Sequence, residues 1–265
     1  MRAAFISDLH IGSAGFHGGI QRKLTQYSEP FAAEFIEKLN SREYEFAVQL
    51  GDLIEDADEE TDRRNLHRGV EILQHSSVPL YHVAGNHDTG HLTAPELGRI
   101  FGLPSLYYSF QAGDCLGIVL HSVLAYPGEA RTIIPSAQLA WLQDELQIAP
   151  GPVIVFVHHS LADQDLDGNP WFEGRPEGAL IENRQEVRRM LAASGKVAAV
   201  INGHVHWNRI DHHDDIPYIT IQSAIENFTD DGTPAHAWGE ISLTDGRLKI
   251  DVFGNDRISF RYDSR

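Results

Sequence analysis

Short apolar runs alternate with longer amphipathic stretches along the first three quarters of the chain. Several short runs are continuously hydrophobic, which is typical of strands covered on both faces. The predicted strands are residues 3–7, 46–50, 80–84, 116–122, 153–158, 197–202, 217–222, 237–243 and 248–253. The amphipathic stretches repeat their apolar positions at helical spacing. They predict helices at residues 30–40, 61–76, 94–101, 136–148 and 185–193.

The order of these elements predicts the fold class. Strands and helices alternate first, whereas the C-terminal part consists almost wholly of strands. We therefore expect an α/β protein with pairing that is parallel early and antiparallel late. No linker or internal repeat interrupts the pattern, so the 265 residues are expected to form a single domain, residues 1–265.

Composition and net charge limit which cellular compartments and which binding partners are expected for this protein. A single cysteine, Cys115, excludes intramolecular disulfides and indicates a reducing compartment. No apolar run reaches about 18 residues, and the N-terminal residues predict a strand rather than a signal peptide, so we expect a cytoplasmic protein that does not enter membranes. The net charge of −17 repels phosphate backbones, which disfavours polymeric nucleic acid and leaves a small phosphorylated substrate as the expected partner. Homo-oligomerisation is left open.

Side chains of metal-ligand type follow five of the predicted strands. The five clusters are Ser7-Asp8-Leu9-His10, Gly51-Asp52, Gly85-Asn86-His87-Asp88, His158-His159 and Gly203-His204-Val205-His206. In an open α/β sheet the carboxyl ends of strands form the crevice where ligands bind, so these clusters are expected to converge. Asp8 and His10 are two residues apart, as are His204 and His206. On an extended backbone the members of each pair would point to the same side.

Alone, each of these clusters is more typical of a turn or a cap than of a site. Together and in this order, they favour a metal centre built from imidazoles, carboxylates and one amide. That donor set suits Mn, Fe, Zn or Co and does not select among them. The candidate ligands are Asp8, His10, Asp52, Asn86, His158, His204 and His206. Because these donors exceed the needs of one ion, we expect two, with Asp52 able to bridge ions roughly 3.5–4 Å apart.

In this order the clusters resemble the five-part signature of calcineurin-like metallophosphoesterases, over residues 6–206. The segment 223–227 is also similar to the branch that includes class III cyclic nucleotide phosphodiesterases and glycerophosphodiesterase-like enzymes. The resemblance implies a four-layer α/β-β/α sandwich with mixed sheets around a dinuclear centre. The implied ligands are Asp8, His10, Asp52 and His206 for one metal, and Asp52, Asn86, His158 and His204 for the other. His159 is expected to support His158.

A mechanism follows from such a centre. A water that bridges two cations becomes a hydroxide nucleophile near neutral pH, and the cations neutralise phosphoryl oxygens. We expect two divalent or mixed-valence transition metal ions, with manganese favoured over iron, zinc or cobalt. His87 is the expected catalytic residue, because an imidazole there could protonate the departing oxygen or stabilise phosphoryl charge. The alternative is that His87 only braces Asn86.

Substrate selection is expected to lie in the loops. Residues 161–181 predict an irregular cap loop, and segments of this length in a compact domain are usually functional or mobile. Trp171 and Phe172 are predicted to pack on an apolar or base moiety of the substrate, although they could equally anchor the loop or a dimer contact. His17 and His91 are further candidates for substrate binding.

These observations predict a dinuclear metal-dependent phosphohydrolase. We favour a phosphodiesterase that acts on small soluble phosphate esters or nucleotides. A phosphomonoesterase and a pyrophosphatase of nucleotide conjugates remain alternatives within this class of enzyme. A non-catalytic interaction scaffold on the same fold is the alternative outside it.

Overall fold

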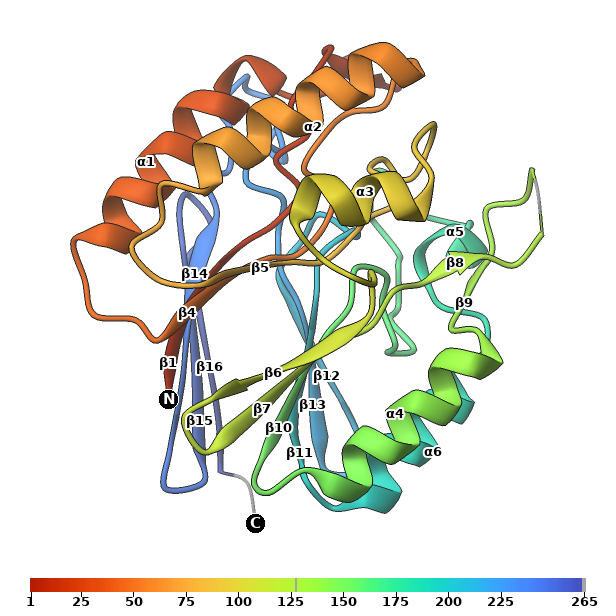
Figure 1. The fold of residues 1–265 in the computed structure, drawn as a ribbon. Helices are drawn as coiled ribbons and strands as arrows, with labels where there is room; N and C mark the ends of the chain where they lie inside the picture. The colour runs from red at the N-terminus through yellow and green to blue at the C-terminus, as the bar shows by residue number, and fades with distance from the viewer. Residues whose placement is uncertain (127, 264–265) are drawn as a thin grey trace.

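Two mixed sheets form the centre of the computed structural model, which describes residues 1–126 and 128–263 (Figure 1). The first sheet contains, in spatial order, β16 (Ile258–Asp263), β15 (Arg247–Phe253), β14 (Trp238–Thr244), β1 (Arg2–Ile6), β4 (Phe46–Gln49) and β5 (Leu80–His82). Strands β1, β4 and β5 pair in parallel, and β14 joins β1 antiparallel. The first sheet is therefore parallel among its early strands and antiparallel among its late ones, as the sequence predicts.

The second sheet has the same mixed character. It contains, in spatial order, β12 (Arg209–His213), β13 (Ile216–Thr220), β11 (Val197–Asn202), β10 (Val153–Phe156), β7 (Cys115–Val119) and β6 (Tyr108–Ala112). The four inner strands are parallel, and both edge strands pair antiparallel with their neighbours. The carboxyl ends of the inner strands therefore meet along one edge.

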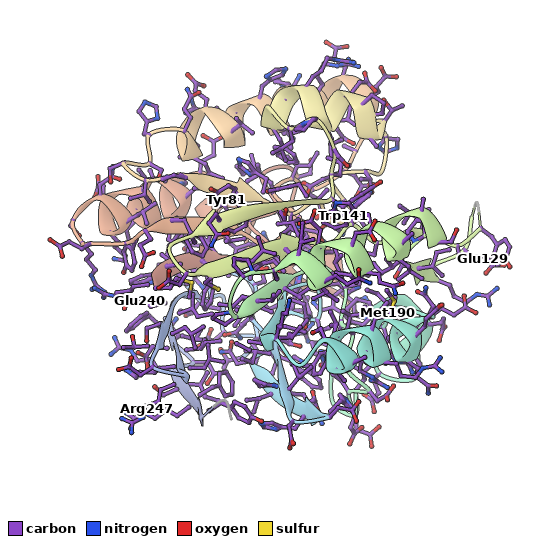
Figure 2. The ribbon with its side chains drawn as sticks, turned by 60° about the horizontal axis from the view of Figure 1, so that its bottom comes forward. Tyr81, Glu129, Trp141, Met190, Glu240 and Arg247 are labelled. Carbon is purple, nitrogen blue, oxygen red and sulfur yellow. The ribbon has the colours of Figure 1, made fainter. Side chains whose placement is uncertain are left out.

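Helices cover the outer face of each sheet (Figure 1). On the first sheet lie α1 (Ser28–Asn40), α2 (Glu59–Leu73) and α3 (Ala94–Phe101), and on the second lie α4 (Ser136–Ile148) and α6 (Arg184–Ser194). Trp141 of α4 and Met190 of α6 belong to the apolar layer beneath these two helices (Figure 2). Among the described residues, no helix has the length and apolar character needed to cross a membrane.

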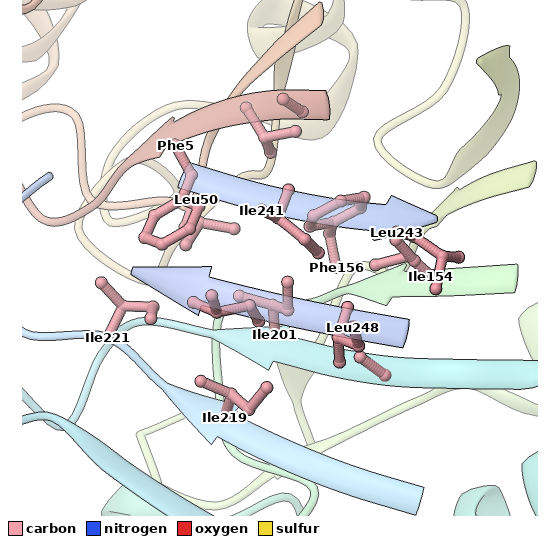
Figure 3. Close-up of a cluster of buried hydrophobic side chains, with 14 of the residues drawn as sticks. Phe5, Leu50, Ile154, Phe156, Ile201, Ile219, Ile221, Ile241, Leu243 and Leu248 are labelled. Atoms are coloured by element: carbon pink, nitrogen blue, oxygen red, sulfur yellow. The ribbon is translucent and has the colours of Figure 1, made fainter. Parts of the chain in front are cut away.

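The main core lies between the two sheets. Phe5 and Ile241 of the first sheet and Phe156 and Ile201 of the second belong to one cluster of buried side chains (Figure 3). Burying a side chain of this size contributes about 1.5–3 kcal/mol, so this layer holds the sheets together. The order of layers is helix, sheet, sheet, helix, which confirms the expected four-layer α/β-β/α sandwich.

Small elements near one edge of the sandwich were not predicted. They are the hairpin β2 (Gly15–His17) and β3 (Ile20–Lys23), η1 (Thr25–Tyr27), the pair β8 (Val123–Leu124) and β9 (Thr132–Ile133), and α5 (Pro176–Ala179). Strands β6, β12 and β16 were also missed. These segments are short or lie at sheet edges, so they lack the continuous apolar pattern of the inner strands.

Several predicted strands end earlier than expected, and two of these ends affect the site. The predicted strand 153–158 ends at Phe156, and the predicted strand 116–122 ends at Val119. His158 therefore lies in the loop beyond β10 rather than within the strand.

Helix α2 begins at Glu59, two residues before the predicted start, because the Asp58 side chain accepts hydrogen bonds from the backbone N–H groups of the first turn.

Candidate metal centre

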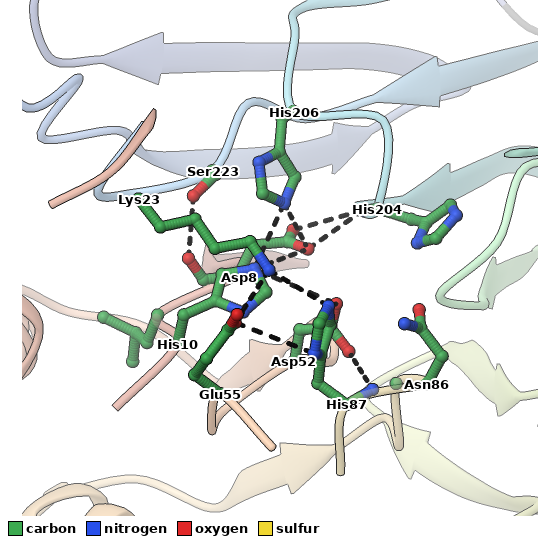
Figure 4. A network of polar contacts seen from close by, with 12 residues as sticks. Asp8, His10, Lys23, Asp52, Glu55, Asn86, His87, His204, His206 and Ser223 are labelled. Atoms are coloured by element: carbon green, nitrogen blue, oxygen red, sulfur yellow. Dashed lines mark hydrogen bonds and ion pairs between the residues drawn. The ribbon is translucent and has the colours of Figure 1, made fainter. Parts of the chain in front are cut away.

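The loops after β1, β4, β5, β10 and β11 bring the predicted ligands together at the carboxyl edges of the two sheets (Figure 4). His206 Nε2 lies 3.3 Å from Asp8 Oδ1 and 3.2 Å from His10 Nε2. On the other side, His158 Nε2 lies 3.2 Å from Asp52 Oδ2. His10 Nε2 is 3.9 Å from a carboxylate oxygen of both Asp8 and Asp52, so the two sides adjoin.

These side chains form two groups with the spacing of metal ligands. One group is Asp8, His10 and His206, and the other is Asp52, His158 and His204. Within each group the potential ligand atoms lie within 4.8 Å of one another, and all six residues are buried. The two groups match the two halves of the ligand set that the family resemblance implies, except that Asn86 is absent from the second group and the shared Asp52 appears only in the second.

The backbone at the site is unusual. Five of the predicted ligands have positive φ angles, namely Asp8 (51°), His10 (47°), Asp52 (51°), His204 (66°) and His206 (61°). Such left-handed conformations are uncommon in residues other than glycine and cluster at functional sites. The expectation that the two spaced pairs lie on extended backbone is therefore wrong. Their side chains converge because each chain segment turns in the left-handed region directly after its strand.

Glycines allow two of these turns to approach the ligands closely. Gly51 has a φ of 104°, and a Cβ atom there would overlap the ring of His158. A Cβ at Gly203 would overlap the Ser7 hydroxyl and the Asp8 carboxylate. Both positions therefore require glycine.

Each of the four predicted histidine ligands has its outer ring nitrogen held by a second group. The pairs are His10 Nδ1 with Glu55 Oε2 (2.9 Å), His158 Nδ1 with Leu50 O (2.9 Å), His204 Nε2 with Gly178 O (2.8 Å) and His206 Nδ1 with Glu226 Oε2 (2.6 Å). Three of these contacts are hydrogen bonds and the His10–Glu55 contact is an ion pair, and outer contacts of this kind fix the tautomer and orientation of metal-ligating histidines. In His10, His158 and His206 the remaining nitrogen, Nε2, lies 3.2–3.3 Å from another predicted ligand, where a cation could be held between them.

Two buried polar atoms support the same interpretation. Asn86 Oδ1 is buried and has no hydrogen-bond partner within the described part of the chain, and His158 Nε2 has only the ion-pair contact with Asp52 beside it. A buried polar atom without a partner costs about 1–3 kcal/mol. A cation bound beside Asp52 would satisfy both atoms, so the residues present fit metal ions.

Neighbouring charges keep the carboxylates of Asp8 and Asp52 ionised, as anionic metal ligands must be. Burial alone would raise the pKa of Asp8, but the hydrogen bond and charge of His206 outweigh it and lower the pKa to about 2. Burial opposes ionisation of Asp52 as well, yet the charges of His158 and His87 hold its pKa well below the usual value. Both carboxylates are therefore ionised at neutral pH and available as anionic ligands.

His87 lies beside the two groups. Its backbone N–H donates to Asp52 Oδ1 at 3.0 Å, and its Nδ1 is hydrogen-bonded to the Asp56 carboxylate. Its Nε2 lies 3.0 Å from Lys23 Nζ and 4.0 Å from Asp52 Oδ2. Burial alone would lower the pKa of His87, but the charge of Asp52 and the Asp56 hydrogen bond raise it.

A cavity of about 600 Å³ opens onto the metal centre and is lined by Asp52, Asn86, His87, His204 and His206 among others. Its walls come from the β2–β3 hairpin and from the predicted cap loop 161–181. His17 of the hairpin and Trp171 of the loop lie with their ring centroids 5.0 Å apart. Phe172 also lines the cavity, with its ring 4.8 Å from that of His204.

His91 lies apart from the other predicted substrate-binding residues. It is outside the lining of this cavity, and its Nδ1 is hydrogen-bonded to Asp62 Oδ2 at 2.8 Å. Its partner Asp62 belongs to the first turn of α2 and is itself buried. The structure therefore groups His91 with a helix start rather than with the metal centre.

Sequence reasoning did not single out Lys23, Asp56 or Glu226, all of which contact the site. Lys23 Nζ lies 2.7 Å from Glu55 Oε2, and Asp56 and Glu226 hold His87 and His206. Lys23 and Asp56 belong to no motif, and Glu226 lies in the segment 223–227, whose family resemblance did not mark it as a partner of His206.

A helix–sheet–sheet–helix sandwich with two groups of buried histidines and carboxylates at the strand ends is the arrangement of a dimetal phosphoesterase. The family model described as calcineurin-like phosphoesterase matches residues 1–208, and the chain belongs to this family.

The similar proteins of known name include protein phosphatases and cyclic-nucleotide phosphodiesterases. The chain is 27% identical to serine/threonine-protein phosphatase CPPED1 of Mus musculus over 259 residues, covering 93% of this chain and 78% of that protein. It is 25% identical to a 3',5'-cyclic-nucleotide phosphodiesterase of Nostoc over 199 residues, covering 72% of this chain and 66% of that protein. A crystal structure of a dimetal phosphatase from Danio rerio superimposes with a TM-score of 0.81 at 17% identity, covering 100% of this chain and 99% of the other.

Proposed function

We propose that this protein hydrolyses small phosphate esters with two metal ions held by Asp8, His10, Asp52, Asn86, His158, His204 and His206. The observation that carries the proposal is the set of outer contacts, three hydrogen bonds and the His10–Glu55 ion pair, that hold all four histidines around two ionised carboxylates. A scaffold that never binds metal would have no need to bury these groups in this form. This argues against the non-catalytic alternative.

The metals would supply Lewis acidity toward the phosphoryl oxygens and lower the pKa of a water molecule that attacks phosphorus. Asp8 and Asp52 provide the negative charge that retains the cations, and the imidazoles and Asn86 complete a set without thiolate. Such a set suits Mn, Fe, Zn and Co, and manganese is our preferred metal.

The remaining chemistry belongs to the side chains around the metals. His87 is anchored through Nδ1 by Asp56, which leaves Nε2 on the side of Asp52 and Lys23. We assign to His87 Nε2 the role of holding a proton near the departing oxygen or stabilising charge on the phosphoryl group. Trp171 and Phe172 line the cavity beside His206 and His204 and would limit the access of water to it.

Two substrate classes fit this centre. The sequence favours a phosphodiesterase, and the similarity to a 3',5'-cyclic-nucleotide phosphodiesterase supports that proposal. The similarity to CPPED1, which spans more of the chain and is named a protein phosphatase, supports a phosphomonoesterase. The size of the cavity, about 600 Å³, and the acidic net charge favour a small soluble ester over a polymer in both cases.

A screen of manganese-reconstituted protein against monoesters, diesters, cyclic nucleotides and pyrophosphates tests the proposal. The matched variants are Asp52→Asn and, as a control for the same chemical change away from the site, Asp114→Asn. We expect turnover of at least one ester class, a loss of at least about 100-fold in Asp52→Asn, and no loss in Asp114→Asn. Absence of turnover in every class, or full activity in Asp52→Asn, would contradict the proposal.

A further inference from the structure

Lys23 is a buried cation in the wall of the catalytic cavity. It is the last residue of β3, its side chain is about 5% exposed, and it lines the cavity together with Asp52, His87 and Trp171. Lysine is almost never this buried unless its charge is paired. The protein is strongly acidic, with a net charge of −17, yet this positive charge lies beside the site where a phosphate would bind.

The backbone holds Lys23 in one position. Lys23 forms a β-bridge with Glu226, and the N–H of the next residue, Leu24, donates to Ile225 O at 3.1 Å. Opposite the side chain lies Gly15, where a Cβ atom would come within 2.9–3.1 Å of the Lys23 methylene groups. The lysine stem therefore occupies a slot that a glycine leaves open. Most of the rotamer entropy of this side chain is already lost before a ligand arrives.

The ammonium group has donor capacity to spare. A lysine ammonium presents three N–H donors. Lys23 Nζ lies 2.7 Å from Glu55 Oε2 and 3.0 Å from His87 Nε2 (Figure 4). No third acceptor for Nζ occurs among residues 1–126 and 128–263, and Nζ lies 5.3 Å from the centroid of the Trp171 ring. At least one N–H therefore remains for a ligand in the cavity that these residues line, and a second is free when His87 Nε2 carries a proton.

The charge of the ligand decides what this donor can recognise. A phosphomonoester carries nearly two negative charges at neutral pH, because its second pKa is about 6, whereas a diester carries one. A fixed cation in a partly enclosed site acts strongly on that extra charge. The other cation in the cavity wall, Arg175, is exposed and its guanidinium is hydrogen-bonded to Trp171 O.

We propose that Lys23 binds a phosphoryl oxygen of the substrate and makes the site prefer phosphomonoester dianions over diesters. The inference rests on the proposed phosphohydrolase function and names the substrate class within it. Lys23 acts here as a substrate-binding residue whose position is set by the β2–β3 hairpin.

The test compares two chromogenic esters, para-nitrophenyl phosphate and bis(para-nitrophenyl) phosphate. Both release para-nitrophenolate, a good leaving group, so the comparison depends little on a proton donor. The variants are Lys23→Met, which keeps the length of the stem, and Lys23→Arg, which keeps the charge. Arg22→Met is the matched control, because Arg22 is the preceding residue of β3 and pairs with Asp230 instead of the site.

We expect Lys23→Met to lower kcat/KM for the monoester by about 10- to 100-fold, the range for a hydrogen bond between charged groups. The loss for the diester should be less than about threefold, and Lys23→Arg should recover part of the monoester activity. The inhibition constant for inorganic phosphate, measured with the diester as substrate, should rise by about tenfold in Lys23→Met. Arg22→Met should leave all three quantities unchanged.

Metal content and thermal unfolding of each variant separate this role from a structural one. If Lys23 served only to hold Glu55 and thereby His10, Lys23→Met would lose bound metal and both activities together, which would overturn the inference. Unchanged monoester turnover in Lys23→Met would overturn it too. Failure of the underlying phosphohydrolase proposal has a different signature, because the metal-reconstituted wild-type protein would then hydrolyse neither ester.

Discussion

His206 and Glu226 share a buried hydrogen bond of 2.6 Å between the imidazole Nδ1 and the carboxylate Oε2. The same oxygen accepts a hydrogen bond of 3.1 Å from Trp171 Nε1 in the cap loop. Burial alone would lower the pKa of His206, but its contacts with Asp8 and Glu226 raise it to about 9. One carboxylate thus orients a predicted metal ligand and anchors the wall of the cavity.

Glu226→Gln should weaken metal binding by about 10- to 100-fold, the usual effect of removing the outer partner of a ligating histidine. Glutamine keeps the size of the side chain but not its charge. Metal affinity can be measured by competition with a chelating dye. Glu177→Gln, the same change on the exposed face of α5, is the control and should have no effect. Equal affinities in all three proteins would show that Glu226 does not act on the metal.

Replacement of both Trp171 and Phe172 by alanine should impair substrates with an aryl or base group. These rings wall the cavity, and aromatic contacts contribute about 0.5–1.5 kcal/mol each, so KM should rise by about tenfold. For methyl phosphate, which offers no ring to stack, KM should change little. Steady-state kinetics on the two types of ester test this, with Phe228→Ala, an exposed aromatic outside the cavity lining, as the control. Unchanged KM on both types would remove the substrate-packing role.

His82 should make the stability of the fold depend on pH. It is buried and stacked on Phe101 with ring centroids 4.5 Å apart, its Nδ1 has no hydrogen-bond partner in the described residues, and burial lowers its pKa to about 4. The unfolded chain takes up this proton near pH 6.5. The contribution of neutral His82 is therefore complete above about pH 6.5 and is lost as the pH falls toward 4.

His82→Phe keeps the stacked ring and removes the titration. Between pH 7.5 and 4.5 the wild-type protein should lose about 2–3 kcal/mol more unfolding free energy than the variant. Urea unfolding at the two pH values measures this difference. Parallel losses in both proteins would mean that His82 is not buried in its neutral form.

The predicted ligands could be read from the sequence because each lies directly after a buried strand. Asp8, Asp52 and His204 follow runs of apolar residues that mark the inner strands, and parallel strands bring their carboxyl ends to one edge. The position of the strand ends does not predict the backbone conformation of the ligands themselves. The left-handed backbone at Asp8 and His204 depends on contacts between loops, such as the Asp8 N–H that donates to Gly51 O and the His204 N–H that donates to the Asp8 carboxylate.

The supporting residues could not be predicted, because their contacts join segments far apart in the sequence. Glu226 reaches His206 from the loop between β13 and β14, and Lys23 reaches His87 from a hairpin of two short polar strands. Glu226 lies in the segment 223–227 that resembles the family, but nothing there indicates its bond to His206, and Lys23 has no spacing or neighbour that marks its role. The same limit applies to His91, whose sequence position near His87 gave no sign of its bond to Asp62.

The number of transition metal ions bound per chain tests the central claim most directly. It should be measured by elemental analysis after reconstitution with manganese and removal of free metal, in wild-type protein and in His158→Ala. The account predicts about two ions in the wild type and about one in His158→Ala, because the group of Asp8, His10 and His206 remains intact. A wild-type protein that retains no ion, or a His158→Ala variant that retains as many as the wild type, would contradict it.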